Sequence, residues 1–164
     1  MRKTALHPKA KGEAAEVYFF YKATCQGLRL SKPLGDSAPY DVISEYQGRL
    51  ARIQVKSTTV CAENNYSIQV SFTSQRRPYT AREIDFVAAY VGPEDVWYII
   101  PVKVLRCRTN IHLYPHTTGV GQFEQFREAW RLLLGPLPRG TRSVAGKSLD
   151  ASLKHIRKSG NTDF

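Results

Sequence analysis

Gln54 and Lys56 stand two residues apart in the stretch Arg52 to Thr58 (RIQVKST), where they alternate with the apolar Ile53 and Val55. A β-strand turns alternate side chains to opposite faces, so Gln54 and Lys56 would share one face and the intervening Val55 the other. A solvent-exposed lysine on an edge strand would show the same alternation. The pair therefore indicates chemistry only if other polar groups meet it.

A predicted hairpin places an aspartate against this pair. The segment 40–57 (YDVISEYQGRLARIQVKS) indicates two strands joined at Gln47-Gly48. With a two-residue loop, Asp41 lies directly across from Gln54. Opposed Cβ atoms are about 5 Å apart, so a carboxylate, an amide and the Lys56 ammonium would reach one bound ion or phosphate.

A second carboxylate could come from the first predicted helix, over residues 13–26 and ended by Gly27. Its apolar and β-branched residues recur at helical spacing: Val17, Phe20, Tyr21 and Thr24. Glu16 lies one turn before Phe19 and Phe20, so it would border the face that packs on the sheet. A surface position, which is the ordinary place for a helix glutamate, remains the alternative.

The remaining elements predict the fold class. Residues 66–72 indicate a third strand, and residues 83–105 indicate two more around a turn at 92–95. A final helix is expected from Gln122, with apolar residues at helical spacing up to a Gly135-Pro136 stop. The pattern predicts an α/β or α+β fold, in which helices flank one central, mixed β-sheet.

Positive charge concentrates at the two ends of the chain. The net charge is +10, and residues 1–12 and 136–164 together carry eight of these charges. We expect a basic N-terminal arm over 1–12, a single domain over 13–135 and a basic, disordered tail over 136–164. Such ends suit a nucleic-acid partner, although polar tails can also serve solubility alone.

Other residues define further expectations. Arg76, Arg77 and Arg82 lie in a proline-broken connection where they could contact DNA, and a solvated loop is the alternative.

The three cysteines are odd in number and widely spaced, so we expect reduced thiols in or near the core instead of disulfides or a zinc site. No run is long enough to span a membrane and no secretory signal begins the chain, so we expect a soluble, cytoplasmic protein.

The order of these motifs resembles that of the PD-(D/E)XK nuclease superfamily. A KG-x-x-AE helix start (residues 11–16), GDSAPYDVI with Asp41, and then QVKS with Lys56 follow one another as in its Holliday-junction-resolvase-like branch. Within that branch the chain is most similar to the homing endonucleases of bacterial group I introns. The resemblance covers residues 11–105 and implies a restriction-endonuclease-like core.

The resemblance implies a Mg²⁺-dependent endonuclease that hydrolyses double-stranded DNA, with Mn²⁺ as a substitute ion. Asp41, Glu16 and the main-chain carbonyl of Val55 would hold the metal, and Lys56 would stabilise developing charge or orient water. Most members have an acid where this chain has Gln54, whose amide oxygen could ligate without adding charge.

The resemblance and the single set of motifs leave several functions open. Cutting both strands needs two sites, so we expect a homodimer or homotetramer, acting on the bacterial nucleoid. The primary expectation is a site-specific homing endonuclease. The alternatives are a structure-selective junction resolvase and a catalytically inactive nucleic-acid-binding protein of the same fold.

Overall fold

A computed structural model describes most of the chain up to residue 135. The described residues are 7–35, 37–72, 76–117, 119 and 121–135. The predicted tail over 136–164 and the first six residues of the predicted arm lie outside them.

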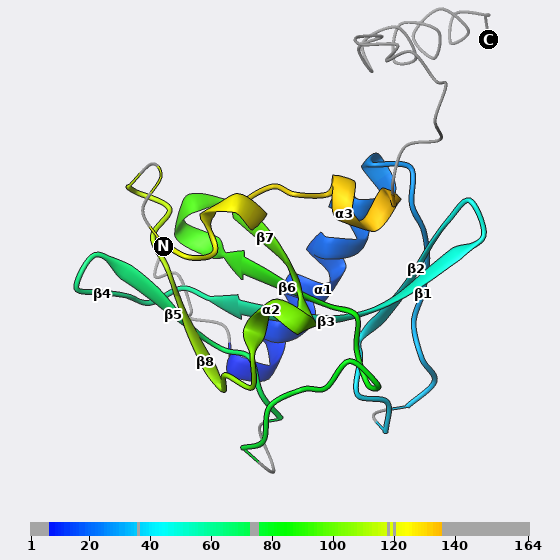
Figure 1. Cartoon of the computed structure of the whole chain (residues 1–164), viewed down its shortest axis with the longest axis horizontal. Coiled ribbons are helices and arrows are strands. Elements are labelled where there is room, and N and C mark those ends of the chain that lie inside the picture. The colour runs from blue at the N-terminus through cyan, green and yellow to red at the C-terminus, as the bar shows by residue number, and fades with distance from the viewer. Residues whose placement is uncertain (1–6, 36, 73–75, 118, 120, 136–164) are drawn as a thin grey trace, which may run out of the picture.

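A five-stranded mixed sheet forms the centre of the molecule (Figure 1). Its strands in spatial order are β1 (Arg29–Ser31), β2 (Val42–Tyr46), β3 (Arg49–Thr58), β6 (Phe86–Val91) and β7 (Val96–Pro101). All neighbours are antiparallel except β3 and β6, which run parallel. The predicted α+β class with a central mixed sheet is confirmed.

The β2–β3 hairpin has the register expected from its sequence. Gln47 and Gly48 form its two-residue turn with φ angles of 50° and 77°, which suit the right-handed twist of the strands. The ladder continues one residue beyond β2, where the Asp41 amide donates to the carbonyl of Ile53 at 3.0 Å. Asp41 therefore lies at the end of the hairpin, across from Gln54.

Helix α1 (Pro8–Cys25) covers one face of the sheet. It begins five residues before the predicted start because Pro8 suits the first helical position and His7 caps the helix by accepting from the Lys9 amide. Its buried face is Ala15, Phe19 and Ala23, which pack against β3 and β7.

The predicted apolar stripe on this helix is wrong. Val17 and Tyr21 are 71% and 63% exposed, because small alanines let the helix approach the sheet along the neighbouring stripe. Phe20 is only partly buried and Thr24 is exposed. An aromatic-rich helix does not reveal its inner face by hydrophobicity alone.

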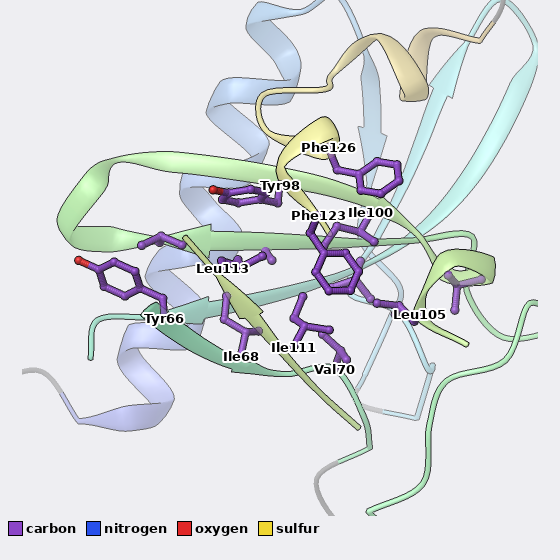
Figure 2. Close-up of a cluster of buried hydrophobic side chains, with 14 of the residues drawn as sticks. Tyr66, Ile68, Val70, Tyr98, Ile100, Leu105, Ile111, Leu113, Phe123 and Phe126 are labelled. Atoms are coloured by element: carbon purple, nitrogen blue, oxygen red, sulfur yellow. The ribbon is translucent and has the colours of Figure 1, made fainter. Parts of the chain in front are cut away.

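A second sheet covers the opposite face, where helices had been expected. Its strands are β4 (Cys61–Ala62), β5 (Asn65–Gln69) and β8 (Asn110–Leu113), in the order β4-β5-β8. The predicted third strand is thus β5, and it belongs to this small sheet instead of the central one. Figure 2 shows the inner side chains of the second sheet gathered in one cluster with Tyr98 and Ile100 of β7.

Short helical turns complete the described fold. A 3₁₀ turn, η1 (Gly92–Glu94), joins β6 to β7 as the sequence indicated, and α2 (Val102–Leu105) follows β7. The predicted final helix is instead two pieces, η2 (Glu124–Phe126) and α3 (Arg131–Leu134).

Glu128 is the physical reason for this break. Its backbone has a φ of 47°, its amide donates to the Trp97 carbonyl at 2.7 Å, and its carboxylate accepts from the Trp97 amide at 2.7 Å. The same carboxylate accepts from Trp130 Nε1 at 2.7 Å. Hydrogen bonding to the β7 edge therefore replaces the helical pattern.

Two further observations concern the whole described chain. Cys25, Cys61 and Cys107 are all free and exposed, so the expectation of thiols in or near the core is wrong. They lie at a helix end, on a two-residue strand and in a turn, where the backbone itself is on the surface.

Within the described residues, no helix combines the length and apolar character needed to cross a membrane.

Candidate active site

A cavity of about 730 Å³ lies between the first turns of α1 and the end of β3. The four side chains predicted to form a site all line it: Glu16, Asp41, Gln54 and Lys56. Val55 lines it as well, together with Lys9 and Lys11. The structure thus brings together residues from a helix, a hairpin end and a central strand.

The strand pairing explains why Gln54 and Lys56 point the same way. In the parallel ladder they pair with Val87 and Ala89, whose side chains belong to the cluster beneath the second sheet. Ile53 and Val55 instead pack in the cluster under α1. The polar pair therefore interrupts an otherwise apolar face of the central sheet.

Asp41 is held firmly and is partly removed from water. Its Oδ2 accepts from the Val55 amide at 2.8 Å and from Gln54 Nε2 at 2.5 Å. Burial raises the pKa of the Asp41 carboxyl, the negative charge of Glu16 raises it further, and the Val55 hydrogen bond and Lys56 oppose the rise. A desolvated carboxylate beside another acid favours a cation in the cavity.

The buried Gln54 amide has a defined orientation. Its Nε2 faces both Asp41 Oδ2 and the Val55 carbonyl, the latter at 3.4 Å. Both neighbours can only accept hydrogen bonds, so the nitrogen and not the oxygen must point toward them. In this arrangement Gln54 positions the aspartate.

Lys56 is half-buried, and its ammonium lies 5.8 Å from the centre of the Tyr79 ring. Burial lowers the pKa of this lysine, while Asp41 and Glu16 partly counteract the effect. It makes no ion pair with any residue that the structure describes. The ammonium is therefore available to an incoming anion.

Glu16 stands on the cavity wall contributed by α1. Its side chain is 22% exposed and accepts from Lys32 Nζ at 2.6 Å. The predicted position beside the packed helix face is confirmed, since Ala15 next to it is buried. Lys32 holds the carboxylate at the wall.

The donor atoms in the cavity suit a hard divalent ion. Two carboxylates and a main-chain carbonyl are oxygen ligands, and within the described residues no hydrogen bond ends on Asp41 Oδ1. The described part of the chain contains no cluster of three His, Cys, Asp or Glu side chains that would form a complete protein cage. Mg²⁺ fits such a sparse set because it keeps several waters.

The arginines predicted to contact DNA lie outside this cavity. Arg77 forms two hydrogen bonds with Glu83, at 2.6 and 3.0 Å, and stacks over Phe72. Arg76 and Arg82 are exposed. A DNA contact by any of the three stays a prediction.

Some residues around the site were not found from the sequence. Tyr79 lies far along the chain from Lys56, and nothing in the spacing of the two indicates their contact. The ion pair between Lys32 and Glu16 likewise joins the residue after β1 to helix α1, and the sequence did not indicate it. Lys9 and Lys11 had been assigned to the basic N-terminal arm. Only the high positive charge of that segment indicated that they could contact a nucleic acid.

Comparison with known proteins agrees with this geometry. A family model described as PD-(D/E)XK endonuclease matches residues 6–133, which include every residue of the site. The chain belongs to the PD-(D/E)XK endonuclease family.

A solved structure supports the membership of this PD-(D/E)XK endonuclease. The bacterial homing endonuclease I-Ssp6803I is similar to it with a TM-score of 0.69 and 30% sequence identity. The match covers 79% of this chain and 93% of that one. The comparison with curated proteins gave no significant match. The suspected superfamily and the proximity to homing endonucleases are therefore confirmed.

Proposed function

We propose that this PD-(D/E)XK endonuclease cuts double-stranded DNA at specific sites in a divalent-metal-dependent reaction, as a homing endonuclease. The observation that carries the proposal is the meeting of Asp41, Gln54, Lys56 and Glu16 in one cavity. The similarity to a bacterial homing endonuclease over most of both chains supports the specific role.

In this proposal Asp41, Glu16 and the Val55 carbonyl hold Mg²⁺, or Mn²⁺ in its place. A bound Mg²⁺ would neutralise the scissile phosphate and make a water more acidic. Gln54 orients Asp41 through its hydrogen bond to Oδ2, which leaves Oδ1 without a hydrogen bond among the described residues. Among the described lining residues only Glu16 and Asp41 carry carboxylates, which predicts a modest metal affinity.

Lys56 supplies positive charge to the reacting phosphate. Its ammonium is partly desolvated and unpaired within the described chain, so its interaction with a phosphate oxygen is stronger than it would be in bulk water. Lys9 and Lys11 at the cavity wall would bind neighbouring phosphates and set the DNA backbone in place.

Cleavage of both strands requires two such sites. Each chain carries one set of motifs, so we propose that a homodimer or homotetramer performs the reaction. A monomer acting alone would nick one strand at a time.

The experiment is cleavage of a plasmid library that carries many candidate sites, in Mg²⁺, in Mn²⁺ and in excess chelator. We expect discrete cuts in either metal, none in chelator and none with Lys56→Ala. Lys22→Ala is the matched control, because Lys22 also lies over a tyrosine ring but does not line the cavity. Cutting in chelator, or by Lys56→Ala at the wild-type rate, would refute the proposal.

The same proteins separate the alternatives. Preferential cutting of a four-way junction over every duplex would indicate a resolvase. DNA binding without any metal-dependent cutting would indicate a catalytically inactive binding protein.

A further inference from the structure

We propose that the outer face of the second sheet enters the major groove of duplex DNA and reads base edges beside the cut. This outer face consists of Ser67 and Gln69 on β5, Asn110 and His112 on β8, and Asn65 at the start of β5. The inference rests on the proposed DNA substrate and adds the surface that gives sequence specificity.

Side chains in the second sheet alternate strictly. Tyr66 and Ile68 of β5 and Ile111 and Leu113 of β8 point into the core, as Figure 2 shows. The residues between them point outward, and the four on β5 and β8 beyond Asn65 are exposed. No strand or helix of the described chain covers this face, so its polar groups are presented to solvent.

The chemistry of this face suits base recognition. Every outward side chain is an amide, a hydroxyl or an imidazole, each able both to donate and to accept. Ser67 lies opposite His112, and Gln69 lies opposite Asn110. Asparagine and glutamine amides match the paired donor and acceptor of adenine in the major groove.

Hydrogen bonds within the face hold these groups in fixed positions. Asn110 Nδ2 donates to Ser67 Oγ at 2.8 Å, and His112 Nδ1 lies 2.9 Å from Asn65 Oδ1. Each amide keeps unused donors and acceptors for a ligand. Because few side-chain rotamers remain to be fixed on binding, the entropy cost of recognition is reduced.

The surrounding charge is complementary to DNA. Residues 64–82 and 96–123, which contain β5 and β8, carry six arginines and lysines and no aspartate or glutamate. Arg77 is paired with Glu83 just beyond the first segment, whereas Arg76 is exposed beside Gln69. Two acids lie toward the far end: Glu63 in the β4–β5 turn and Glu94, which accepts from the Tyr66 hydroxyl at 2.8 Å. The face itself is therefore neutral and polar, with Arg76 at the end nearest Gln69.

Position relative to the candidate active site favours the same role. After β5, Ser71 forms a bridge with Pro78, and the next residue, Tyr79, lies beside Lys56. A hollow of about 320 Å³, lined by Gln69, Arg76 and Asn110 among others, opens at that end of the face. A two-stranded ribbon fits the major groove, and alternate strand residues about 7 Å apart match roughly two base-pair steps.

The test is selection of binding sites from a randomised duplex library by the full chain in chelator, which allows binding without cutting. The variants are Gln69→Ala and Asn110→Ala. The control is Gln26→Ala, an exposed glutamine at the end of α1 on the other side of the central sheet. Circular dichroism checks that each variant is folded.

We expect Gln69→Ala and Asn110→Ala to lower affinity for the selected sequence between about 5-fold and 150-fold, the range of one good bidentate contact. Base preference should flatten at one or two adjacent positions, while affinity for random duplex stays within about 2-fold, because the phosphate contacts are intact. Gln26→Ala should match the wild type. If Asn110→Ala destabilises the sheet by freeing Ser67, Gln69→Ala alone decides the outcome.

An unchanged preference in Gln69→Ala, an equal loss on random DNA, or a wild-type protein that selects no sequence would each overturn the inference. Discrete metal-dependent cuts with either of the first two results would leave the proposed function standing, whereas a wild-type protein that selects no sequence would also remove the site specificity of that function. A folded wild-type chain that neither binds nor cuts any DNA would remove both.

Discussion

Replacing Lys56 by methionine should abolish cleavage and stabilise the fold at the same time. Burial destabilises the charged form of Lys56 in the folded chain, and Asp41 and Glu16 stabilise it. Burial has the larger effect, so the pKa of Lys56 is lowered. Methionine keeps most of the aliphatic stem that lies beside Tyr79. Among the described residues the lysine makes no ion pair that would be lost.

The expected gain follows from these opposing contributions. Removing the desolvated charge is favourable, whereas Asp41 loses an attraction that partly compensates its own burial. Relief of one such functional compromise is typically worth about 0.5–2 kcal/mol, and we expect about 1 kcal/mol here. For a chain of 164 residues this corresponds to roughly 3 °C in Tm.

The assay is thermal and urea unfolding in chelator, with Lys22→Met as the control. Lys22 lies 5.6 Å from the Tyr18 ring centre, so this change removes an equal charge and a similar cation–π contact. The control should be neutral or slightly destabilising. The gain from Lys56→Met should be full at pH 7 and shrink as pH rises toward 10.5, where the unfolded lysine also loses its proton. A variant no more stable than the wild type would falsify the desolvation argument.

Three further changes test the site and its supports. Glu16→Gln should raise the Mg²⁺ needed for half-maximal cleavage about 10-fold or more, with Tm changed by less than about 2 °C, because its exposed lysine pair is weak; a large fall in Tm with an unchanged Mg²⁺ titration would make Glu16 structural. Arg77 lowers the pKa of Glu83 to about 2, so the stability this pair gives is complete above pH 4.5 and lost as pH falls toward 2. Glu83→Gln should therefore cost about 1 kcal/mol at pH 7 in urea unfolding and little near pH 2, and a pH-independent cost would contradict this. Glu128→Gln should cost about 1–3 kcal/mol, because one buried N–H loses its acceptor, and a wild-type urea midpoint would show that the break after η2 has another cause.

The hairpin and the positions of its candidate catalytic residues could be predicted because their determinants are local. A two-residue turn at Gln47-Gly48 fixes the register of both strands, and period-two alternation fixes which face Lys56 occupies. From those two rules Asp41 falls opposite Gln54 without knowledge of the rest of the fold. Glu16 was placed beside the packed face because it lies one turn before Phe19, which is buried, although the apolar stripe as a whole was predicted wrongly.

The parts that could not be predicted depend on contacts between distant segments. Whether β5 joins the central sheet or a separate one is decided by its pairing with β8, more than 40 residues later in the chain. The predicted final helix is broken by hydrogen bonds between Glu128 and Trp97. The spacing of apolar residues along that segment does not indicate these bonds. The inner face of α1 is set by alanines, which carry little hydrophobic signal.

The exposed turn at Gln47-Gly48 has a consequence for how chains of this family can diverge. Surface turns are ordinarily where related proteins gain and lose residues without penalty. Here, a change of one residue that is absorbed by sliding β2 against β3 would bring Asp41 opposite Val55, whose side chain points to the other face of the sheet. The two turn residues do not line the cavity, yet the length of the turn sets the register of the candidate catalytic residues. The two turn residues can be exchanged for others that accept a left-handed backbone. An insertion or deletion in the turn that shifts the register would separate Asp41 from Gln54 and so remove the proposed activity.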